Sequence, residues 1–534
     1  MTDAPATVPS PELLAAFEAY ERAILANDLE ALDAAFARRA TTMRADAAGL
    51  LVGHEAISDF RGLRGGVPPR EIVRLETRVL GPDVVLLVSV SRYRDGGQGV
   101  QTQIWEQVDG QWLITAAHVT GRAQAFDRSV WRTVGDPLSQ GAWEGPLAGL
   151  TVAVKDLFAI RGYRIGAGNP TWLRERRREQ ATAPAVSDLL RGGASLRGIA
   201  RTDEFAYSIA GANVHYGTPP NGALPGALPG GSSNGPAAAV ALGQADVGLA
   251  SDTAGSIRVP ASYQGLWGLR TTHGIVPRQG MLPLSQTFDT VGWLARDAET
   301  LDRVATWVLI TDSSADDPEA DITPDAQLPR RIAVPAEALA CTEADTRDAF
   351  QAWLDRAAAT DQVDGVDIVE VGDLSAYLEV FRTVQSAEAW RNNGAWVEAH
   401  PGALGPDIAA RLEMASRVTT EQERAAQNEL SRMRQRIRAL TDEAILVLPT
   451  APGPAPARTA DGPTIETVRA ATLRMTSLAG IGGLPALSAP LLTVPSLLGP
   501  APVGVCFVGP AERDLDLLRW VRAIEAATQD ASGN

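Results

Sequence analysis

Residues 229–258 read PGGSSNGPAAAVALGQADVGLASDTAGSIR, and two loops of small residues alternate there with regular structure. The first loop, 229–235, precedes an alanine-rich segment that predicts a helix, and the apolar run 245–250 predicts a buried strand. The second loop, 251–258, lies between that strand and another predicted helix. Loops of small residues before helices expose backbone N–H groups that hold negative charge. The stretch therefore predicts alternating strands and helices with an anion-stabilising loop.

The same alternation continues from residue 147 to the C-terminus. Apolar runs near 194–199 and 444–448 predict further strands, and residues 386–443 are amphipathic at helical spacing. Strands that alternate with helices favour a mixed sheet with helices on both faces. We therefore expect a large α/β domain in this part of the chain.

Lys155 is the only lysine among 48 lysine and arginine residues. It follows the run TVAV at 151–154, which predicts a buried strand. Arginine stays protonated at any workable pH, whereas a desolvated lysine amine can lose its proton and act as a base. The single lysine therefore indicates a chemical role, and the alternative is a compositional accident at an exposed strand end.

Both loops contain serines, and two of these, Ser232 and Ser256, lie 24 residues apart. A serine hydroxyl needs a base to act as a nucleophile. None of the five histidines is better placed near these loops, so neutral Lys155 is the natural base. The chain lacks the G-x-x-x-x-G-K-[ST] pattern of a phosphate loop and the G-x-S-x-G pattern of a nucleophile elbow. Its two cysteines and its histidines have no metal-ligand spacing.

With these residues the chain resembles the amidase signature family, whose Ser-cisSer-Lys triad hydrolyses amides. Lys155 lies in a V-K-D motif, Ser232 in G-G-S-S and Ser256 in D-T-x-G-S-I-R. The resemblance covers roughly residues 147–510 and implies an α/β core with a mixed central sheet covered by helices. It also implies that Ser256 is the nucleophile and that Ser232 is a bridging serine held by a cis peptide bond.

The mechanism that the resemblance implies needs no cofactor and no metal ion. Neutral Lys155 accepts a proton through Ser232 while Ser256 attacks the amide carbonyl, and water later releases the acid from an acyl-enzyme. The lysine has to be buried to stay neutral near about pH 7. The backbone N–H groups expected to stabilise the oxyanion are those of Thr253, Ala254, Gly255 and Ser256.

Two charged residues, Asp252 and Arg258, flank the nucleophile. The resemblance implies that they hold the loop rather than react, and an ordinary ion pair is an equal alternative.

The family usually has glycine at the position of Ala254; alanine rarely adopts a positive φ, so we expect either a distorted loop or a tolerated methyl group. Asn234 and Pro236 replace the usual small residues, and Pro236 suits a first helical position.

Three stretches, 168–172, 215–219 and 288–293, are similar to the plant-type amidases that hydrolyse indole-3-acetamide. This likeness implies that a small carboxamide is the substrate and that it is cleaved to a carboxylate and ammonia. The segments expected to line the pocket are 286–293, 386–400 and 450–480.

Three alternatives remain for the function. The chain acts on carboxylated ureas or biurets in nitrogen catabolism, or it is an amidotransferase-like subunit for aminoacyl-tRNA, or it is a non-catalytic scaffold. A net charge of −16 argues against a nucleic-acid partner, because binding phosphates needs a basic surface. The intact Lys155, Ser232 and Ser256 argue against a scaffold.

Residues 10–120 predict a small α+β unit. Ser10-Pro11 is a typical helix start, and a second helix is predicted near Asp28. Helices followed by an antiparallel sheet are the order expected of a cone-shaped α+β domain. The predicted strands are 71–80, 84–93 and a hairpin over 101–119 that turns at Asp109-Gly110.

The motifs GHEAI at 53–57 and WLITAAHV at 112–119 resemble the AtzH-like branch of the SnoaL-like cone superfamily. The resemblance implies a ligand pocket in which Tyr20 and Arg44 are catalytic, and a homo-oligomer formed through this domain. From the residues alone, Tyr20 lies on the apolar helix face and suits the core better. For Arg44 the residues alone leave two alternatives open, an anion anchor and an ordinary surface charge.

The expected organisation is a cone domain at 1–125, a connection without periodicity at 126–146 and an amidase signature domain at 147–534. Residues 1–5 begin no basic stretch with an apolar core, and no run of about 18 apolar residues occurs. We therefore expect a cytoplasmic protein with a small-molecule amide as its partner and no membrane partner.

Overall fold

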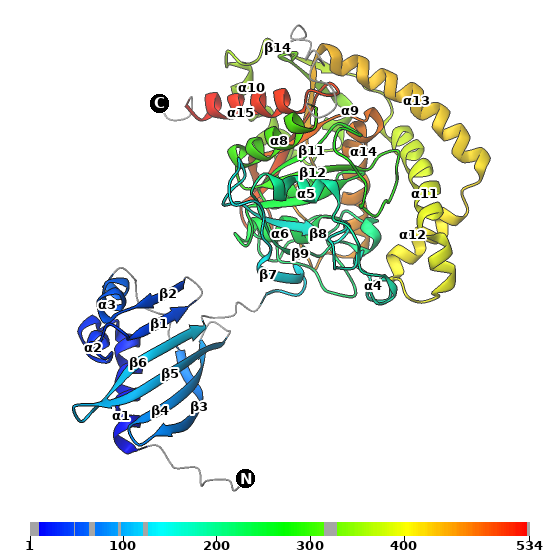
Figure 1. Ribbon diagram of the computed structural model, residues 1–534. Helices are drawn as coiled ribbons and strands as arrows, with labels where there is room; N and C mark the ends of the chain where they lie inside the picture. The colour runs from blue at the N-terminus through cyan, green and yellow to red at the C-terminus, as the bar shows by residue number, and fades with distance from the viewer. Residues whose placement is uncertain are drawn as a thin grey trace. The chain divides into compact units, whose positions relative to one another are not determined.

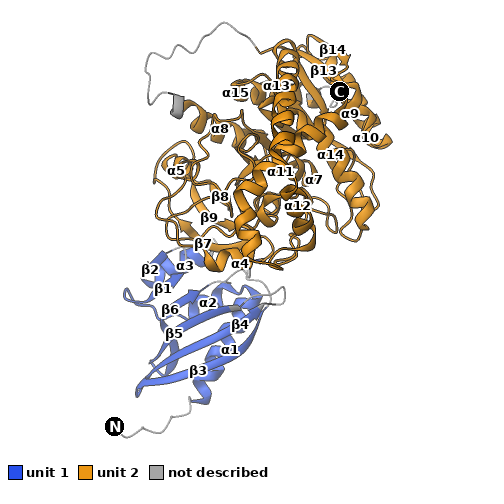
Figure 2. Ribbon diagram, turned by 90° about the vertical axis from the view of Figure 1, so that its right-hand side faces the viewer, with its two compact units in different colours: residues 1–126 blue, residues 127–534 orange. Residues whose placement is uncertain are grey.

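The computed structural model describes residues 10–46, 49–62, 70–93, 98–120, 126–313 and 328–530. The chain forms two compact units, Met1–Phe126 and Asp127–Asn534, and each has its own sheet (Figures 1 and 2). Residues 1–5, on which the expectation about a leader sequence depends, lie outside the described residues.

The first unit has a six-stranded sheet with the order β2-β1-β6-β5-β4-β3. Its neighbouring strands are antiparallel except for β1, which is parallel to β6. This arrangement confirms the predicted α+β unit. Its elements are α1 (Pro11–Ala26), α2 (Leu29–Ala34), β1 (Met43–Asp46), β2 (Gly49–Val52), α3 (His54–Gly62), β3 (Arg70–Gly81), β4 (Val84–Tyr93), β5 (Gln98–Val108) and β6 (Gln111–Thr120).

Local sequence signals set the limits of these elements. Ser10 caps α1, since its hydroxyl accepts a hydrogen bond from the Leu13 N–H at 3.2 Å and satisfies a donor that a helix start leaves free. Asp109 and Gly110, with φ of 52° and 80°, make the turn between β5 and β6. Leu13 and Trp105 of β5 belong to one buried cluster, so α1 packs its apolar face on the sheet.

The second unit is built on an eleven-stranded mixed sheet with the order β14-β13-β15-β17-β16-β11-β12-β10-β8-β9-β7. The strands are β7 (Trp131–Ser139), β8 (Thr151–Lys155), β9 (Ser195–Ala200), β10 (Val247–Asp252), β11 (Trp267–Arg270), β12 (Thr290–Ala295), β13 (Arg331–Pro335), β14 (Gly365–Val369), β15 (Ile445–Pro449), β16 (Ala486–Val494) and β17 (Ala501–Val508). The helices are α4 (Pro170–Glu175), α5 (Pro184–Arg191), η1 (Glu204–Ala206), α6 (Asn234–Ala241), α7 (Arg258–Tyr263), α8 (Ala298–Ser313), α9 (Ala336–Ala340), α10 (Ala344–Ala358), α11 (Leu374–Ala399), α12 (Pro406–Ser416), α13 (Thr420–Glu443), α14 (Gly462–Gly482) and α15 (Asp514–Asp530).

Helices cover both faces of this sheet, as Figure 1 shows for α8 and α15 against α11 and α13. Alternate side chains of a strand point to opposite faces. Ile445 and Val447 of β15 belong to a core cluster with α8, α10 and α15. Leu446 and Leu448 belong to a second cluster with α11, α13 and α14. The predicted mixed α/β core is confirmed.

The predicted connection at 126–146 is wrong in part, because it contains strand β7. This strand lies at the edge of the sheet and pairs antiparallel with β9. Gly135 and the cis bond Asp136-Pro137 lie within it, and the pairing register shifts between Val134 and Ser139. An edge strand tolerates glycine and proline because one of its sides needs no ladder partner, so no regular pattern marks it in the sequence.

No helix within the described ranges is long and apolar enough to cross a membrane. In the same part of the chain, no group of His, Cys, Asp and Glu side chains has the arrangement of a metal site. The two cysteines, Cys341 and Cys506, are free thiols.

Candidate active site

The candidate catalytic residues lie where two parallel strands end. β8 and β10 pair in parallel, so their carboxyl ends lie at the same edge of the sheet. Lys155 is the last residue of β8, and Asp252 is the last residue of β10. Ser232 precedes helix α6, and Ser256 precedes helix α7. The fold therefore brings together three segments that are far apart in the sequence.

Lys155, Ser232 and Ser256 form one continuous line of contacts. Lys155 Nζ lies 2.9 Å from Ser232 Oγ, and Ser232 Oγ lies 3.0 Å from Ser256 Oγ. The peptide bond between Gly231 and Ser232 is cis, as the resemblance implies. Lys155 and Ser232 are fully buried, and Ser256 is 3% exposed. A proton can therefore pass between Ser256 and the amine without entering bulk water.

Two further hydroxyls hold the amine, and the sequence did not single them out. Lys155 Nζ donates to Ser233 Oγ and to Ser251 Oγ, each at 2.9 Å. Ser233 is the second serine of the G-G-S-S motif, and Ser251 lies beside Asp252 at the end of β10. Three hydroxyl groups and no carboxylate thus contact the amine within the described residues.

Burial lowers the pKa of Lys155 to about 7. Removal from water disfavours the charged form of an amine, whereas the negative charges of Asp203, Asp252 and Asp289 favour it. Desolvation is the larger effect. Near neutral pH the amine therefore exists in both its charged and its neutral form, as a general base requires.

Asp252 lies at the centre of a buried ion cluster. Its Oδ1 is 2.9 Å from Arg258 Nη2 and 3.0 Å from Arg270 Nη1, and its Oδ2 accepts from Arg258 Nε at 3.1 Å. Burial would raise the pKa of Asp252, but the two guanidinium groups hold it well below its usual range. Asp252 and Arg258 thus form the expected pair, and Arg270 is a third member that no sequence pattern indicated.

The same carboxylate shapes the nucleophile loop. Asp252 accepts hydrogen bonds from the backbone N–H groups of Gly255 at 2.9 Å and Ile257 at 3.1 Å. The N–H of Gly255 is therefore occupied, which corrects the predicted oxyanion set. The remaining candidates for oxyanion donors are the backbone N–H groups of Thr253, Ala254 and Ser256.

Ala254 does not distort this loop. The positive φ falls on Gly255, at 121°, and Ala254 does not have a positive φ. The Ala254 methyl group is nearly buried in an apolar cluster that includes Phe381 and Leu473. The second of the two expectations for this position, a tolerated methyl group, is the one that the structure bears out.

Two of the three stretches that are similar to plant-type amidases share a contact at Glu204, and the third contacts the nucleophile loop. Asn169 Nδ2 donates to Glu204 Oε1 at 2.6 Å, and His215 Nε2 lies 2.7 Å from the same oxygen. Asp289 accepts from Thr253 Oγ1 at 2.7 Å. These stretches therefore position the wall of the site and the start of the nucleophile loop.

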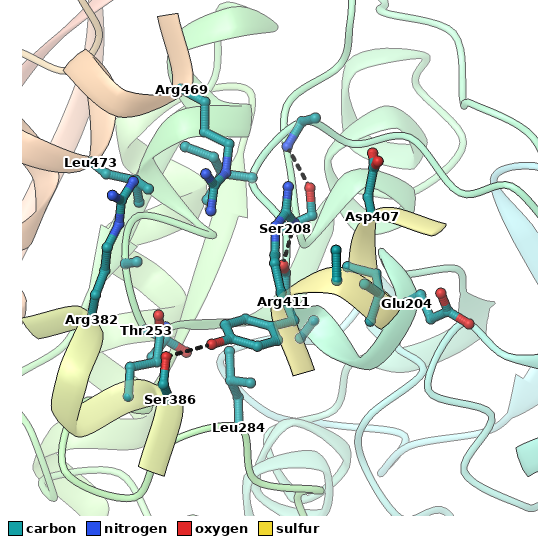
Figure 3. A pocket seen from close by; sticks show the side chains of 18 of the residues that line it. Glu204, Ser208, Thr253, Leu284, Arg382, Ser386, Asp407, Arg411, Arg469 and Leu473 are labelled. Atoms are coloured by element: carbon teal, nitrogen blue, oxygen red, sulfur yellow. Dashed lines mark hydrogen bonds between the residues drawn. The ribbon is translucent and has the colours of Figure 1, made fainter. Parts of the chain in front are cut away.

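A pocket of about 720 Å³ opens onto Thr253, Ala254 and Ser256 (Figure 3). Its lining includes Ser386 and five residues between 462 and 473, as expected from two of the predicted segments. The third expected segment, 286–293, is not among the lining residues; Leu284 lines the pocket in its place. The side chains of 288–293 instead lie in or beside strand β12, inside the protein.

In the first unit, Tyr20 and Arg44 have separate partners. Tyr20 is 3% exposed, and its hydroxyl accepts from Arg61 Nη2 at 3.2 Å. Arg44 pairs with Asp46 at 2.7 Å and lies over the ring of Phe60. The tyrosine therefore lies in the core, as the residues alone suggested, and the arginine that contacts it is Arg61.

Family models match both units of the chain. A model described as Amidase matches residues 132–518, and one described as AtzH-like matches residues 3–124. The first match covers well over half of the chain. The chain belongs to the amidase family. This amidase is therefore an enzyme that acts on amide C–N bonds, and its first unit is an AtzH-like domain.

The amidase also resembles individual proteins. It is 35% identical over 412 residues to Amidase 1 of Arabidopsis thaliana, which is 73% of this chain and 96% of the relative. It is 32% identical to 2-amino-5-chloromuconic acid deaminase of Comamonas testosteroni, over 75% of this chain and 86% of the relative. A solved structure of a vestigial protein complex, related to the origins of an s-triazine catabolic enzyme, matches with a TM-score of 0.63 and 27% identity, over 73% of this chain and 85% of that chain.

Proposed function

We propose that this amidase cleaves a small carboxamide to a carboxylate and ammonia through an acyl-enzyme on Ser256. The observation that supports the proposal is the line of contacts from Lys155 Nζ through Ser232 Oγ to Ser256 Oγ, at 2.9 and 3.0 Å. A serine nucleophile needs a base within hydrogen-bond reach, directly or through one relay group. The amine with a pKa of about 7 supplies that base.

In the acylation step Ser256 Oγ attacks the amide carbonyl and gives its proton to Ser232, which gives its own proton to Lys155. The backbone N–H groups of Thr253, Ala254 and Ser256 stabilise the oxyanion, and such preorganised donors are usually the largest contribution to catalysis. The charged amine then returns the proton through Ser232 to the leaving nitrogen. The C–N bond breaks, ammonia departs and an ester on Ser256 remains.

The deacylation step uses the same groups in reverse. A water molecule gives a proton through Ser232 to Lys155 and attacks the ester carbonyl. The C–O bond to Ser256 breaks, and the proton returns to Ser256 Oγ. The balance is one amide and one water consumed, and one carboxylic acid and one ammonia released.

The alternative substrates are carboxylated ureas or biurets, which the AtzH-like domain favours. An amidotransferase-like subunit would use the same three residues, but its tRNA partner is at odds with a net charge of −16. A non-catalytic scaffold would have no need of a buried, uncompensated amine, which is costly to keep inside a protein. Ammonia release from carboxamides or from carboxylated ureas and biurets separates the two substrate classes, and release from either counts against a scaffold.

The test is ammonia release from indole-3-acetamide, phenylacetamide, short aliphatic amides, biuret and carboxylated ureas. We expect release that falls by at least about 10³-fold in Ser256→Ala, because the nucleophile is lost. The matched control is Ser416→Ala, since Ser416 lies on the exposed end of α12 and bonds only to Glu413 O within its own helix. Equal release from wild type and Ser256→Ala would reject the proposal.

Self-association through the AtzH-like domain and a cytoplasmic location stay predictions. Apolar side chains of this domain are exposed, including Leu50 at 62% and Leu80 at 52%. Light scattering on wild type and on a Leu50→Glu, Leu80→Glu double variant measures the mass; we expect a dimer or larger for the wild type alone. A monomeric wild type would reject the prediction.

A further inference from the structure

Three arginines line the pocket that ends at Ser256. Arg382 projects from α11, Arg411 from α12 and Arg469 from α14 (Figure 3). The chain as a whole is acidic, with 64 acidic against 48 basic residues. A pocket with three guanidinium groups therefore departs from the general charge of the protein.

These guanidinium groups are not fully partnered by the described part of the protein. Arg382 Nη2 and Arg469 Nε are buried and have no hydrogen-bond partner among the described residues. A buried donor without a partner is costly, and a charged one more so. Arg411 donates to Tyr207 O at 2.6 Å, a neutral carbonyl, and the charges of Asp407, Glu466 and Asp203 act on it without an ion pair among the described residues.

The arginines also repel one another. Burial lowers the pKa of Arg382 and of Arg411. The positive charge of Arg469 is the second-largest cause of both shifts. A group of like charges around one cavity is unfavourable unless an anion enters it. Arginine is well suited to this task, because its planar guanidinium binds a carboxylate through two parallel hydrogen bonds.

The acidic residues of the pocket do not neutralise Arg382. Glu466 pairs with Arg469 Nη1 at 2.8 Å, but the Glu466 side chain is 58% exposed, so solvent screens its charge, and the pair leaves Arg469 Nε without a partner. Glu204 already accepts hydrogen bonds from Asn169 Nδ2 and from the N–H of Gly405, and its Oε1 lies 2.7 Å from His215 Nε2. Of the carboxylates that the structure describes, none forms an ion pair with Arg382.

The remaining lining of the pocket is mostly apolar. Ile209, Leu284, Leu378 and Phe381 lie near the nucleophile loop or on α11, and Leu473 lies on α14 one turn beyond Arg469. An apolar wall between a nucleophile and a group of cations suits a molecule with a carboxamide at one end, a hydrocarbon middle and an anion at the other end.

We propose that the physiological substrate is an amide that carries a carboxylate away from the scissile bond, and that Arg382 and Arg469, with Arg411 beside them, bind this carboxylate. The inference rests on the proposed function, because it names the substrate class of the same site. The scissile carboxamide faces Ser256, and the carboxylate lies between α11 and α14. Water is displaced from the arginines when the substrate binds.

The test compares matched amides that differ in one group. Malonamate, succinamate, adipamate and 4-carboxyphenylacetamide are paired with propanamide, butanamide, hexanamide and phenylacetamide. We expect at least one carboxylated member to exceed its neutral partner in kcat/KM, on the order of 10- to 100-fold, through a lower KM. Arg382→Gln and Arg469→Gln should bring that ratio toward one.

The matched control is Arg391→Gln, because Arg391 lies on the same helix α11 but pairs with Glu423 at 2.7 Å and has a side chain that is 58% exposed. The ratio should stay unchanged in this variant. Wild-type enzyme that hydrolyses neutral and carboxylated partners equally well would overturn the inference and leave the proposed function intact.

If none of these amides is hydrolysed, a binding measurement tests the carboxylate site separately from the proposed hydrolysis. Succinate, adipate and 4-carboxyphenylacetate are titrated calorimetrically into Ser256→Ala protein, with and without Arg382→Gln. Binding that weakens at least tenfold in the double variant supports the carboxylate site and counts against the proposed reaction. No binding of any of the three dianions would overturn the inference.

Discussion

Lys155 and Asp252 are both fully buried ionisable residues at the ends of neighbouring strands, and they differ in what surrounds them. Asp252 contacts the guanidinium groups of Arg258 and Arg270. Lys155 contacts three serine hydroxyls, and the nearest carboxylates act on it only from a distance. The pKa of Asp252 stays below its usual range, whereas that of Lys155 falls to about 7. The carboxylate of Asp252, paired with two arginines, stays charged and holds the nucleophile loop. The amine of Lys155, which has no ion-pair partner among the described residues, can exchange a proton near neutral pH.

The largest effect is expected when the amine is removed. Lys155→Arg and Lys155→Met should each lower kcat/KM for the best amide by roughly 10³-fold or more, because neither side chain can accept the proton of Ser232. The losses of kcat/KM caused by Lys155→Met and by Ser256→Ala should not add in the double variant, since the two residues act as a unit. Steady-state ammonia release measures both, and cooperative thermal unfolding checks the fold. Full activity in Lys155→Arg would contradict the assigned base.

The next effect concerns stability rather than chemistry. Asp252→Asn leaves two buried arginines without their countercharge and should lower the free energy of unfolding by about 3–5 kcal/mol. The control is Asp367→Asn, because the pair of Asp367 and Arg331 is half exposed and solvent screens it, so its loss should change the free energy of unfolding far less. Denaturant titration measures both variants. Equal losses in the two variants would contradict a structural role for the buried cluster.

The smallest effect is expected at Ala254. Since Ala254 does not have a positive φ, Ala254→Gly relieves no strain and should leave kcat within about twofold. Its free energy of unfolding should fall by about 0.5–1 kcal/mol, because glycine gains more backbone freedom when the chain unfolds. Steady-state kinetics measure kcat, and denaturant titration measures the free energy of unfolding. A tenfold rise in kcat would show that the methyl group obstructs the oxyanion loop.

The motifs of the sequence predicted the part of the site that lies in short, contiguous segments. Lys155, Ser232 and Ser256 each stand in a recognisable motif, and the structure brings all three together. The alternation of strands and helices likewise predicted the mixed sheet. These features depend on local periodicity and on residue type, which a single sequence contains.

Other features depend on which strands and helices become neighbours. Arg270 reaches Asp252 because β11 and β10 both pair with β12, and Ser251 reaches Lys155 because β10 lies beside β8. The three pocket arginines come from three helices and are not distinguishable among the 47 arginines of the sequence. Strand β7 lacked a regular pattern for the reason given above. Contacts between distant segments cannot be read from composition or spacing.

The most direct test of the central claim is the pH dependence of Ser256 reactivity. Phenylmethylsulfonyl fluoride is applied between about pH 5 and 9, and peptide mass spectrometry locates the label and gives its rate. Because the pKa of Lys155 is lowered to about 7, the amine is protonated below that pH and cannot accept a proton. The account predicts a label on Ser256 whose rate rises about tenfold per pH unit below 7 and levels off above it. A label on another serine, or a rate that does not change across this range, would contradict it.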